Sequence, residues 1–515
     1  MLKLEDLTLR LHPADNVVVV KRPLKPGVEL ESGRLRLVMA KGIPPGHKLA
    51  VAEIADGAPV TKYGQTIGFA KGRILPGEHV HTHNVELRDF GRDYAFGVDA
   101  RPVVYRSAAE MRSFQGFARA SGKAGTRNYI GVISSVNCSA GVSRFVADRF
   151  RGPDFARDFP GIDGVVPFTH KIGCGIQPGA PHELLQRVTA GIARHPNIAG
   201  YVMIGLGCEV NQVHLVAEAH KLDLSRPGEQ PPTFLTIQNS GGVRKTVEAA
   251  AAAVAKLLPA ASALRRTAQP ISKLILAENC GGSDGNSGIT ANPALGVASD
   301  ELVRYGGTSV LAETPEIYGA EHLLTRRAGS AAVGQKIVDL IHWWEAYARA
   351  NGGSIDNNPS YGNKEGGLTT IYEKSLGAVA KGGQSPLAAV YAYAQEIDTP
   401  GFGFMDTPGY DPVSMTGLVS GGCNIGVFTT GRGSVYGCKP SPCIKVATNT
   451  PIYNHMIEDM DINAGTILDG TETVEQVGQR IFEEIIAVAS GKRTKSELAG
   501  LGDDEFAPWL LGAQF

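Results

Sequence analysis

The feature that constrains this chain most is an alternation of short apolar runs, loops and helix-like stretches, which begins at Asn128 and continues through much of the remaining sequence. Such alternation is typical of a parallel sheet with helices on both faces, because parallel strands are joined by crossover helices. The candidate strands are residues 129–136, 164–168, 200–205, 233–237, 273–277 and 308–312, and the candidate helices include 181–193, 243–258 and 474–490. The sequence therefore predicts an α/β protein.

A break in this pattern between Pro259 and Pro270 divides the α/β part into two lobes, which we place at residues 107–268 and 269–515. After Ile355 the chain is rich in glycine and shows little periodicity until the last helix. Long loops in a compact domain are usually functional. We therefore expect Gly-rich functional loops in the second lobe.

The first hundred residues follow a different pattern. Short β-rich runs at 16–21, 36–40, 48–52 and 65–70 are separated by turns rich in proline and glycine, such as Pro44-Pro45-Gly46. This pattern predicts a small all-β domain followed by a charged and aromatic linker, together covering residues 1–106. The linker is long enough to carry the domain over a cavity elsewhere in the protein.

Composition excludes several classes of protein. The 515 residues include 50 Lys and Arg against 51 Asp and Glu, so the basic excess of a nucleic-acid binder is missing. Mean hydropathy is −0.06, and we find no run that approaches the roughly 18 apolar residues of a membrane span. The first residues do not resemble a signal peptide, and the seven cysteines are an odd number, so we expect a cytoplasmic protein with reduced thiols.

Four cysteines have a similar place in the pattern. Each follows a candidate strand within a few residues; they are Cys138, Cys174, Cys208 and Cys280. Because ligands of open parallel sheets bind outside the carboxyl ends of the strands, we expect these thiols to line one cavity and to bind a metal or a cluster. The alternative is that they are small buried hydrophobic residues. Cys443 begins a strand-like run, so we expect it to be structural.

Histidines supply a second set of candidate ligands. If His81-Thr82-His83 is a strand, its two imidazoles point to the same face and can reach one metal ion or one substrate. Surface histidines on a hairpin would give the same pattern. His170 follows a candidate strand and precedes Cys174, which favours a role in a site.

Other motifs are less specific. Ser283 fits a G-x-S-x-G pattern, but a poor helix start follows it, which argues against a serine hydrolase. Arg432 is able to hold a carboxylate through two hydrogen bonds and Lys439 to add a charge, although scattered surface cations would look alike. Glu313 and Glu316 offer further oxygen ligands, and acidic surface loops would explain them equally well.

Several longer motifs resemble the altronate/galactarate dehydratase family. They are SGKAGTRN at 121–128, NCS at 137–139, GLGCE at 205–209, CGGSD at 280–284, GITANP at 288–293 and ETPE at 313–316. GEHVHTHN at 77–84 is similar to the SAF (β-clip) domain that accompanies these enzymes. The resemblance implies a β-clip domain, then a middle lobe involved in dimerisation, then a Rossmann-like lobe, and a homodimer.

The resemblance also implies an activity. Enzymes of this kind eliminate water from an aldonate or aldarate, such as D-altronate, and give a 2-keto-3-deoxy acid with the help of Fe²⁺. Galactarate dehydratase and a sulfolactate-type lyase are alternatives within the same superfamily, and an iron–sulfur cluster is an alternative to Fe²⁺. A metal-binding or ligand-binding scaffold without activity is a further alternative.

Roles for the candidate residues follow from this chemistry, in which a Lewis acid stabilises the charge that develops after proton removal. The expected metal ligands are Cys138, Cys174, Cys208 and Cys280. The expected catalytic residues are His170 as the base, His83 and Glu209. The expected substrate-binding residues are His81, Ser283, Asp284, Asn292, Arg432 and Lys439. We expect His83→Ala to lower kcat and the same change at His47, which follows a turn, to have little effect.

Overall fold

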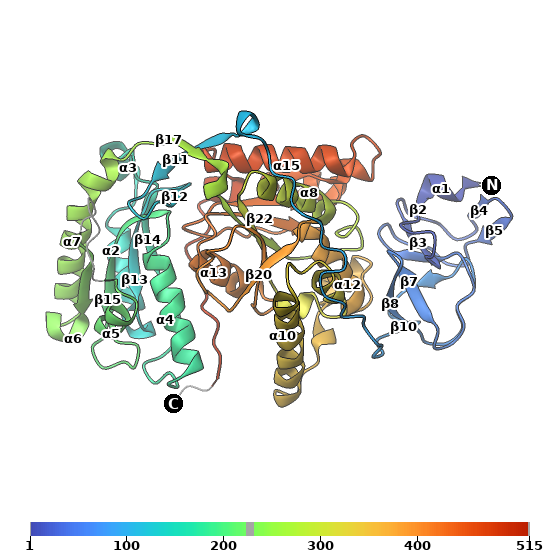
Figure 1. The fold of residues 1–515 in the computed structure, drawn as a ribbon, viewed down its shortest axis with the longest axis horizontal. Coiled ribbons are helices and arrows are strands. Elements are labelled where there is room, and N and C mark those ends of the chain that lie inside the picture. Colours follow the sequence, from blue (N-terminus) through green and yellow to red (C-terminus); the bar gives the residue numbers. More distant parts are fainter. Residues whose placement is uncertain (1, 223–230, 513–515) are drawn as a thin grey trace.

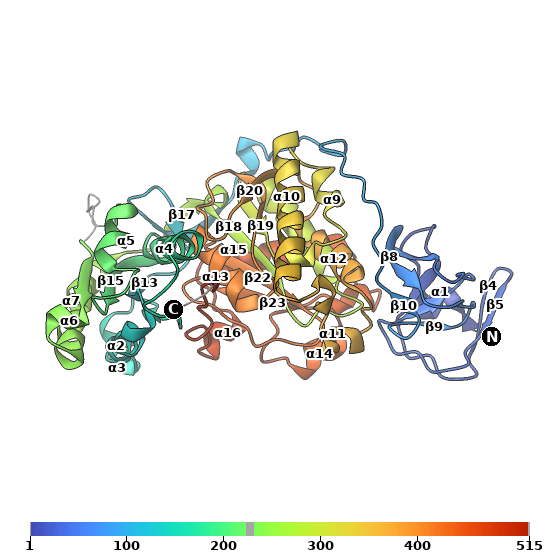
Figure 2. The same ribbon diagram turned by 90° about the horizontal axis from the view of Figure 1, so that it is seen from below.

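The computed structural model describes residues 2–222 and 231–512 and has three parts arranged along its long axis (Figures 1 and 2). The N-terminal β-rich domain lies at one end, the first α/β lobe lies at the other, and the second lobe lies between them. The predicted fold class, a small all-β domain followed by parallel-sheet α/β lobes, is confirmed.

The N-terminal domain consists of short strands in three small sheets. The sheets are β1 (Leu2–Lys3), β4 (Glu29–Ser32) and β5 (Leu35–Val38); β2 (Thr8–Leu9), β3 (Val17–Val20), β6 (Lys48–Ala50) and β9 (His79–Val80); and β10 (Val85–Glu86), β8 (Gln65–Ala70) and β7 (Pro59–Lys62). Helix α1 (Leu4–Leu7) is short. Each of the four predicted β-rich runs overlaps a strand, and the four valines of β3 are all buried.

The predicted strand through His81 and His83 is wrong. Strand β9 ends at Val80, and a turn begins at His81, whose backbone N–H donates to Asn84 Oδ1 over 2.9 Å. Asn84 Nδ2 also donates to the carbonyl oxygen of His79 over 3.0 Å. Asparagine side chains stabilise turns by such bonds to nearby backbone, which is why the strand stops here.

The first lobe contains a four-stranded parallel sheet in the order β14-β13-β15-β16. Its strands are β13 (Tyr129–Ser134), β14 (Gly164–Phe168), β15 (Ile198–Gly205) and β16 (Thr233–Thr236). Its helices are α2 (Asn137–Asp148), α3 (Pro153–Asp158), α4 (Ala180–Ala193), α5 (Val213–Ala219), α6 (Ile237–Ser240) and α7 (Val243–Ala263).

Helix α7 corrects one expectation, because by length and composition it is long and apolar enough to cross a membrane. It buries Val247, Ala250 and Val254 in the core beneath the sheet, together with Ile130 and Val202. A core helix of a domain that is not in a membrane passes the same test of length and composition, so this helix is weak evidence for a span.

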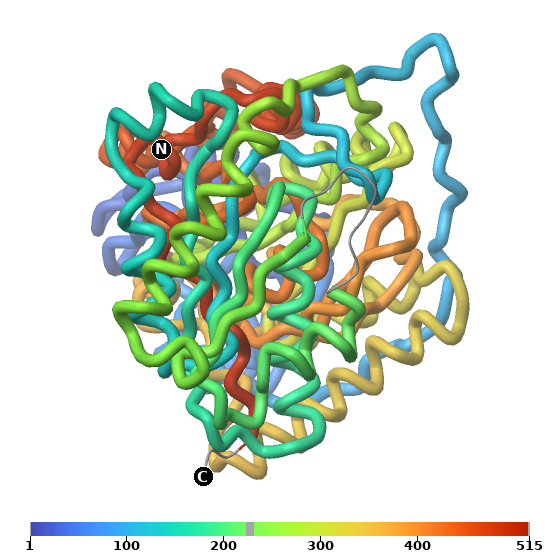
Figure 3. The backbone as a smooth tube through the Cα atoms, turned by 90° about the vertical axis from the view of Figure 1, so that its left-hand side faces the viewer, coloured from blue at the N-terminus to red at the C-terminus, as the bar shows by residue number. Residues whose placement is uncertain are grey.

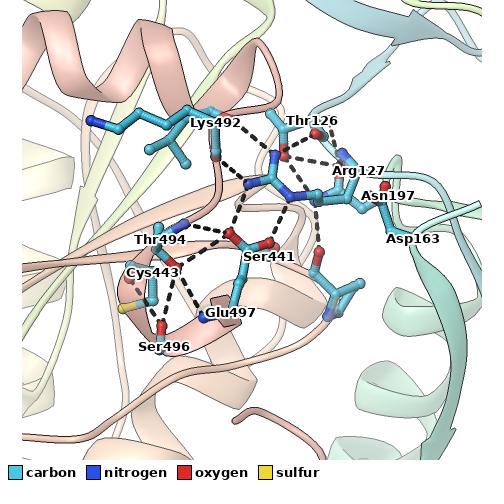
Figure 4. Close-up of polar contacts among 12 residues, drawn as sticks. Thr126, Arg127, Asp163, Asn197, Ser441, Cys443, Lys492, Thr494, Ser496 and Glu497 are labelled. Carbon is cyan, nitrogen blue, oxygen red and sulfur yellow. Dashed lines mark hydrogen bonds and ion pairs between the residues drawn. The ribbon is translucent and has the colours of Figure 1, made fainter. Parts of the chain in front are cut away.

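A small sheet of β11 (Ser113–Ala118), β12 (Ala124–Gly125) and β17 (Thr267–Pro270) joins the two lobes, and Arg127 lies beside it at the junction (Figure 4). The Arg127 guanidinium is buried, pairs with the Glu497 carboxylate over 2.6 Å and donates to the carbonyl oxygens of Thr126, Val488 and Lys492. Burial would raise the pKa of Glu497, but the bond and charge of Arg127 lower it. The motif at 121–128 therefore holds the two lobes together.

The second lobe contains a seven-stranded parallel sheet in the order β20-β21-β19-β18-β22-β23-β24. Its strands are β18 (Ile275–Cys280), β19 (Thr308–Leu311), β20 (Leu387–Tyr391), β21 (Gly401–Met405), β22 (Ile425–Thr430), β23 (Cys443–Ala447) and β24 (Ile462–Asn463). Its helices are α8 (Ala291–Arg304), α9 (His322–Thr325), α10 (Ala331–Ala350), α11 (Tyr361–Glu365), α12 (Ile371–Val379), α13 (Asp411–Gly421), α14 (Thr450–His455), α15 (Val474–Ala489) and α16 (Lys495–Leu498).

The expectation of long loops after Ile355 is wrong for much of that segment, which contains strands β20 to β24 and helices α12 and α13. Helix α12 is buried along its whole length and α13 along most of its length, and α13 shows no apolar stripe of helical period. Glycines shorten the apolar runs of β21 and β22. Cys443 is the first residue of β23 and is buried, as expected.

The linker from the N-terminal domain lies on the second lobe (Figure 3). Arg326 pairs with Asp93 and with Asp99, both over 2.6 Å, and Arg92 pairs with Glu321 over 2.6 Å. Figure 3 shows the later part of this segment as extended chain at the outside of the molecule. These ion pairs fix the linker along the surface that it crosses.

Candidate functional site

The four strand-end thiols do not meet at one edge, because their strands belong to two different sheets. Cys280 ends β18 of the second lobe and is buried. Cys138, Cys174 and Cys208 follow β13, β14 and β15 of the first lobe and are exposed. The expected common cavity for all four is therefore wrong.

His170 and Glu209 also lie in the first lobe, where the side chains of both form hydrogen bonds with nearby backbone groups. His170 Nδ1 accepts the N–H of Ile172 over 3.2 Å, and Nε2 lies 3.2 Å from the carbonyl oxygen of Ser134. Burial lowers the pKa of His170 to about 4. The buried Glu209 carboxylate accepts the hydroxyl of Ser135 and the N–H of Gly207. With both ring nitrogens engaged, His170 is not placed to act as a base.

A cluster of buried charged groups lies at the carboxyl end of β18 and β19. Lys381 Nζ lies 2.8 Å from Cys280 Sγ, and Cys280 Sγ lies 3.6 Å from Glu316 Oε2. Lys374 Nζ pairs with Glu316 Oε1 over 2.6 Å, and Lys381 Nζ lies 4.0 Å from Glu313 Oε2. We call these five residues the β18-edge cluster.

Glu313 is the most unusual member of this cluster. Its backbone has a positive φ of 74°, which costs a non-glycine residue energy and is frequent at functional sites. Both oxygens of its carboxyl group are buried and have no hydrogen-bond partner among the described residues. Burial and then the nearby Glu316 raise its pKa well above the usual value. Asp411 is similar, since burial and Glu316 raise its pKa to about 6.

The N-terminal domain docks beside this cluster through a buried ionic contact. Lys48 and Lys62, at strands β6 and β7, pair with opposite oxygens of Glu373 on α12 over 2.8 and 2.9 Å. Burial would raise the pKa of Glu373, but the two lysine charges outweigh it and lower this pKa far below its usual value. The next residue on α12 is Lys374, so the start of this helix separates the docking contact from the β18-edge cluster.

The two backbones approach closely at the same interface. A Cβ atom on Gly285 or Gly367 of the second lobe would collide with the carbonyl oxygen of Gly46. Gly46 and Gly367 also have positive φ values, of 79° and 104°. Glycine is needed at these positions because only it allows both the conformation and the contact.

Three histidines of the N-terminal domain converge at this interface. His47 Nδ1 lies 3.0 Å from His79 Nε2, and the His81 ring centroid lies 4.8 Å from that of His47. The Nε2 atom of His47 lies 3.0 Å from the carbonyl oxygen of Glu365 in the second lobe. Burial, with neighbouring positive charges, lowers the pKa of His79 to about 3 and that of His81 to about 4. These imidazoles, the histidine trio, are therefore neutral near pH 7.

The histidine trio fits a divalent transition metal. One nitrogen from each ring lies within 4.8 Å of the others, and His81 Nδ1 is buried without a partner among the described residues. His47 Nδ1 and His79 Nε2 lie 3.0 Å apart, and neutral imidazole nitrogens suit divalent transition metals such as iron and zinc. The bond from His47 to a carbonyl oxygen orients the ring, as is usual for metal ligands.

Cys280, Glu313 and Glu316 also lie within 4.8 Å of one another and form a second set of possible ligands. Lys381 Nζ already contacts Cys280 Sγ, and Lys374 already pairs with Glu316. Burial also raises the pKa of the Cys280 thiol to about 11, so this sulfur is not a thiolate near pH 7. A metal ion would have to displace both ammonium groups. The imidazoles therefore fit a metal better than the β18-edge cluster does.

Several predicted substrate-binding residues lie at the same interface. Asp284 is buried and accepts hydrogen bonds from Ser287, Thr448 and Asn449. A Cβ on Gly366 would contact both Asp284 and the side chain of Arg432, so these two lie next to each other. The exposed Arg432 guanidinium lies 3.2 Å from Glu365, the residue whose carbonyl oxygen contacts His47.

The remaining candidates divide between the site and the framework. Ser283 is buried, and its carbonyl oxygen accepts a bond from Asn363. Asn292 is buried on α8, bonded to Thr429 and to the carbonyl oxygen of Gly377. The structure does not bring Lys439 to the site, because it pairs with Asp503 over 2.6 Å. His83 is exposed, with its ring centroid 5.5 Å from that of His79.

Sequence reasoning missed His47, His79 and the lysines that flank the site. A signal was present for His79, which is two residues before His81 and so has the spacing that was applied to His83. Lys374 and Glu373 are charged residues within an otherwise apolar stretch, which is itself a sign of a buried pair. No pattern in the sequence connects Lys48 and Lys62 to a helix more than three hundred residues later.

Known families match this chain over almost its whole length. The family model described as "Altronate/galactarate dehydratase SAF domain" matches residues 6–88. The model "D-galactarate dehydratase/Altronate hydrolase, second domain" matches residues 116–262, and "D-galactarate/Altronate dehydratase, C-terminal" matches residues 271–514.

Three relatives illustrate the similarity. Altronate dehydratase of Bacillus subtilis is 36% identical over 95% of this chain and 96% of its own length. Galactarate dehydratase (L-threo-forming) of Escherichia coli is 36% identical over 96% of this chain and 95% of its own length. The (2R)-sulfolactate sulfo-lyase of Chromohalobacter salexigens matches through two subunits, beta at 30% identity over 77% of this chain and alpha at 36% over 15%. The chain therefore belongs to the D-galactarate/altronate dehydratase family and is a hydro-lyase, as the motifs predicted.

Proposed function

We propose that this protein is a sugar-acid dehydratase that removes water from an aldonate such as D-altronate and forms a 2-keto-3-deoxy acid. The likeness to altronate dehydratase over 95% of the chain supports the reaction. We place the site at the interface between the N-terminal domain and the second lobe, on the following observation. There three neutral imidazoles, the exposed Arg432 and the buried Asp284 come together.

The side chains at this interface suit the reaction. Arg432 is exposed and planar, and it is able to hold the substrate carboxylate through two hydrogen bonds. The polar side chains around Asp284 suit the substrate hydroxyls. Burial and Glu316 raise the pKa of Asp411 to about 6, which suits proton transfer near neutral pH, and they raise the pKa of Glu313 well above its usual value. We assign proton transfer to these two carboxyl groups in place of His170.

We also propose that His47, His79 and His81 hold Fe²⁺. When bound, this ion supplies Lewis acidity toward the oxygens of the substrate. Burial keeps the three rings neutral, which is the state in which an imidazole binds a metal. The Glu365 carbonyl oxygen fixes the orientation of His47, and so the second lobe helps to shape a site built on the N-terminal domain.

Galactarate is the second candidate substrate, because the galactarate dehydratase relative is as similar as the altronate dehydratase relative. An aldarate carries a carboxylate at each end and needs a second cationic group. Sulfolactate is less favoured, since the sulfo-lyase subunit is 30% identical and matches 77% of the chain.

The test is an assay of keto-acid formation under anaerobic conditions with D-altronate, galactarate and sulfolactate. Metal-free protein is prepared with a chelator and then supplied with Fe²⁺. We expect turnover of a sugar acid only after Fe²⁺ is added, with D-altronate as the best substrate. Full turnover by the chelated protein would contradict the metal assignment, and absence of keto acid from both sugar acids would contradict the function.

Two matched variants test the location of the metal. His47→Ala removes a ring that contacts both His79 and Glu365, so we expect Fe²⁺ affinity and kcat to fall by about 10- to 100-fold. His83→Ala removes an exposed ring of the same domain and is the control, with kcat changed by less than about twofold. Equal loss in both variants, or loss in His83→Ala alone, would reverse this assignment. The homodimer and the cytoplasmic location stay predictions.

A further inference from the structure

Three thiols lie at one edge of the first-lobe sheet, in a place that the proposed dehydratase site does not use. Cys138 is the second residue of α2, directly after β13, and Cys174 and Cys208 lie in the loops after β14 and β15. Strands β14, β13 and β15 are parallel neighbours, so their three loops leave the sheet on the same side. This lobe lies at the opposite end of the molecule from the N-terminal domain (Figures 1 and 2).

Hydrogen bonds tie the three loops to one another. The N–H of Asn137 donates to the carbonyl oxygen of Ile172 over 2.9 Å, which joins the Cys138 and Cys174 loops. The N–H of Val210 donates to the carbonyl oxygen of Cys174 over 3.0 Å, which joins the Cys174 and Cys208 loops. The relative positions of the thiols are therefore set by the backbone before any ligand binds.

Buried polar side chains support these loops from below. Glu209 accepts the hydroxyl of Ser135 over 2.7 Å, and Asn211 Nδ2 donates to the carbonyl oxygen of Ser135 over 3.0 Å. Asn211 Oδ1 is buried and has no partner among the described residues. Gln238 Nε2 lies 3.4 Å from Cys208 Sγ and is a donor to that sulfur. A chain that needed only to cover its sheet edge would not need this polar support.

The thiols themselves are free and exposed. They lie on three loops that follow neighbouring parallel strands and are joined by backbone hydrogen bonds. None of the three forms a disulfide. Binding of a metal would release the thiol protons and balance the negative charge that accumulates there.

The spacing distinguishes a single ion from a cluster. Among the described residues, only the histidine trio and the set of Cys280, Glu313 and Glu316 have three ligand atoms within 4.8 Å of one another. One ion with metal–sulfur bonds of about 2.3 Å needs its sulfurs at most about 4.6 Å apart. An iron–sulfur cluster binds each thiolate through a different iron, so it accepts a wider spacing.

We propose that Cys138, Cys174 and Cys208 hold an iron–sulfur cluster of the [4Fe–4S] type, separate from the histidine trio. Three thiolates leave one iron without a protein ligand, and the exposure of the site leaves that position open to water or an oxygen ligand. Gln238 donates toward one ligand sulfur, and the amino end of α2 adds a favourable dipole at Cys138.

The test is anaerobic reconstitution of the full chain with an iron salt, sulfide and a thiol reductant, followed by desalting and analysis of iron and acid-labile sulfide. We expect the wild type to retain about four irons and about four sulfides per chain. Cys138→Ser, Cys174→Ser and Cys208→Ser should each retain at least fivefold less sulfide. Cys438→Ser is the matched control, because a serine keeps its bond to the Ser441 carbonyl oxygen, and it should retain as much sulfide as the wild type.

A second measurement uses the wild-type protein, so its result does not depend on whether the serine variants fold. In the reconstituted wild type, Cys138, Cys174 and Cys208 should be protected from alkylation, as measured by mass spectrometry, and a chelator should expose them. Iron bound without sulfide, or sulfide retained by the triple serine variant, would overturn the proposal. His81→Ala should keep the cluster, so loss of dehydratase activity in that variant is separate from this result.

Discussion

His170 is a buried neutral imidazole, and this gives it an effect on stability that is independent of catalysis. Its pKa is lowered to about 4 by burial, whereas an exposed histidine in the unfolded chain titrates near 6.5. As the pH falls from 6.5 toward 4, the unfolded chain binds a proton that the native protein does not. Native stability therefore decreases over this window, by up to about 3 kcal/mol in total.

We predict that His170→Gln is less stable than the wild type at pH 7 but loses less further stability on acidification. The measurement is the thermal unfolding midpoint at pH 7 and pH 5. His214→Gln, which changes an exposed histidine on α5, is the control and should follow the wild type. A His170→Gln profile parallel to that of the wild type would show that this imidazole is not a buried neutral group.

The histidines also show how far single residues could be predicted. The spacing i, i+2 does bring two rings together, those of His79 and His81, which stack with centroids 5.3 Å apart although His81 lies just after the end of β9. The rule failed for His83 because a turn begins at His81, and this turn depends on two hydrogen bonds of the Asn84 side chain. His47 could not be found at all, since a long-range contact with His79 and Glu365 gives it its place.

At the scale of elements, helix α12 joins the N-terminal domain to the second lobe. The Glu373 carboxylate of this helix balances the positive charges of two fully buried lysines, Lys48 and Lys62. We predict that Glu373→Gln, which keeps the size of the side chain, destabilises the protein by about 3–5 kcal/mol, because it leaves buried charge unbalanced.

This change should lower the unfolding midpoint and make the linker near residue 90 easier to cleave in limited proteolysis. Glu53→Gln is the control: it removes the partner of Arg73 in an exposed ion pair of the same domain, and it should leave both measurements unchanged. An unchanged midpoint in Glu373→Gln would show that the two lysines are not held by this carboxylate.

Helices and strands in which apolar and polar residues alternate with a clear period were predicted well, and elements that are buried on most sides were not. Strand β8 was predicted at its observed bounds and helix α15 to within one residue, because their patterns are local. Helix α13 was missed because most of its surface is buried, and burial removes the alternation on which the prediction depends. Cys138, Cys174 and Cys208 follow their strands as predicted, whereas Cys280 is the last residue of β18. The sequence did not show that these strands form two sheets.

At the scale of the whole molecule, the N-terminal domain is continuous with the second lobe. One apolar core contains Val60 and Ile67 of that domain together with Ile371, Tyr372 and Phe404 of the second lobe. Strand β8 packs on α12 within this core. The domain is therefore packed into the same core as the second lobe, unlike a mobile lid, and it contributes the histidine trio.

The subunits of the sulfo-lyase relative suggest a sharper test of this continuity. Its alpha and beta subunits match 15% and 77% of this chain, so this chain joins in one polypeptide what that enzyme has in two. We predict that residues 107–515 alone have a lower unfolding midpoint than the full chain and no dehydratase activity. Addition of residues 1–106 as a separate chain should restore both, because the buried lysines and the apolar core give the fragment a defined docking place.

The same experiment separates docking from chemistry when the added fragment carries His81→Ala. That fragment keeps Lys48, Lys62 and the apolar face, so it should raise the unfolding midpoint as the wild-type fragment does. It lacks one ring of the histidine trio, so it should restore less than about a tenth of the activity. Wild-type kinetics in residues 107–515 without any fragment would show that the trio is dispensable and that the site lies within the second lobe alone.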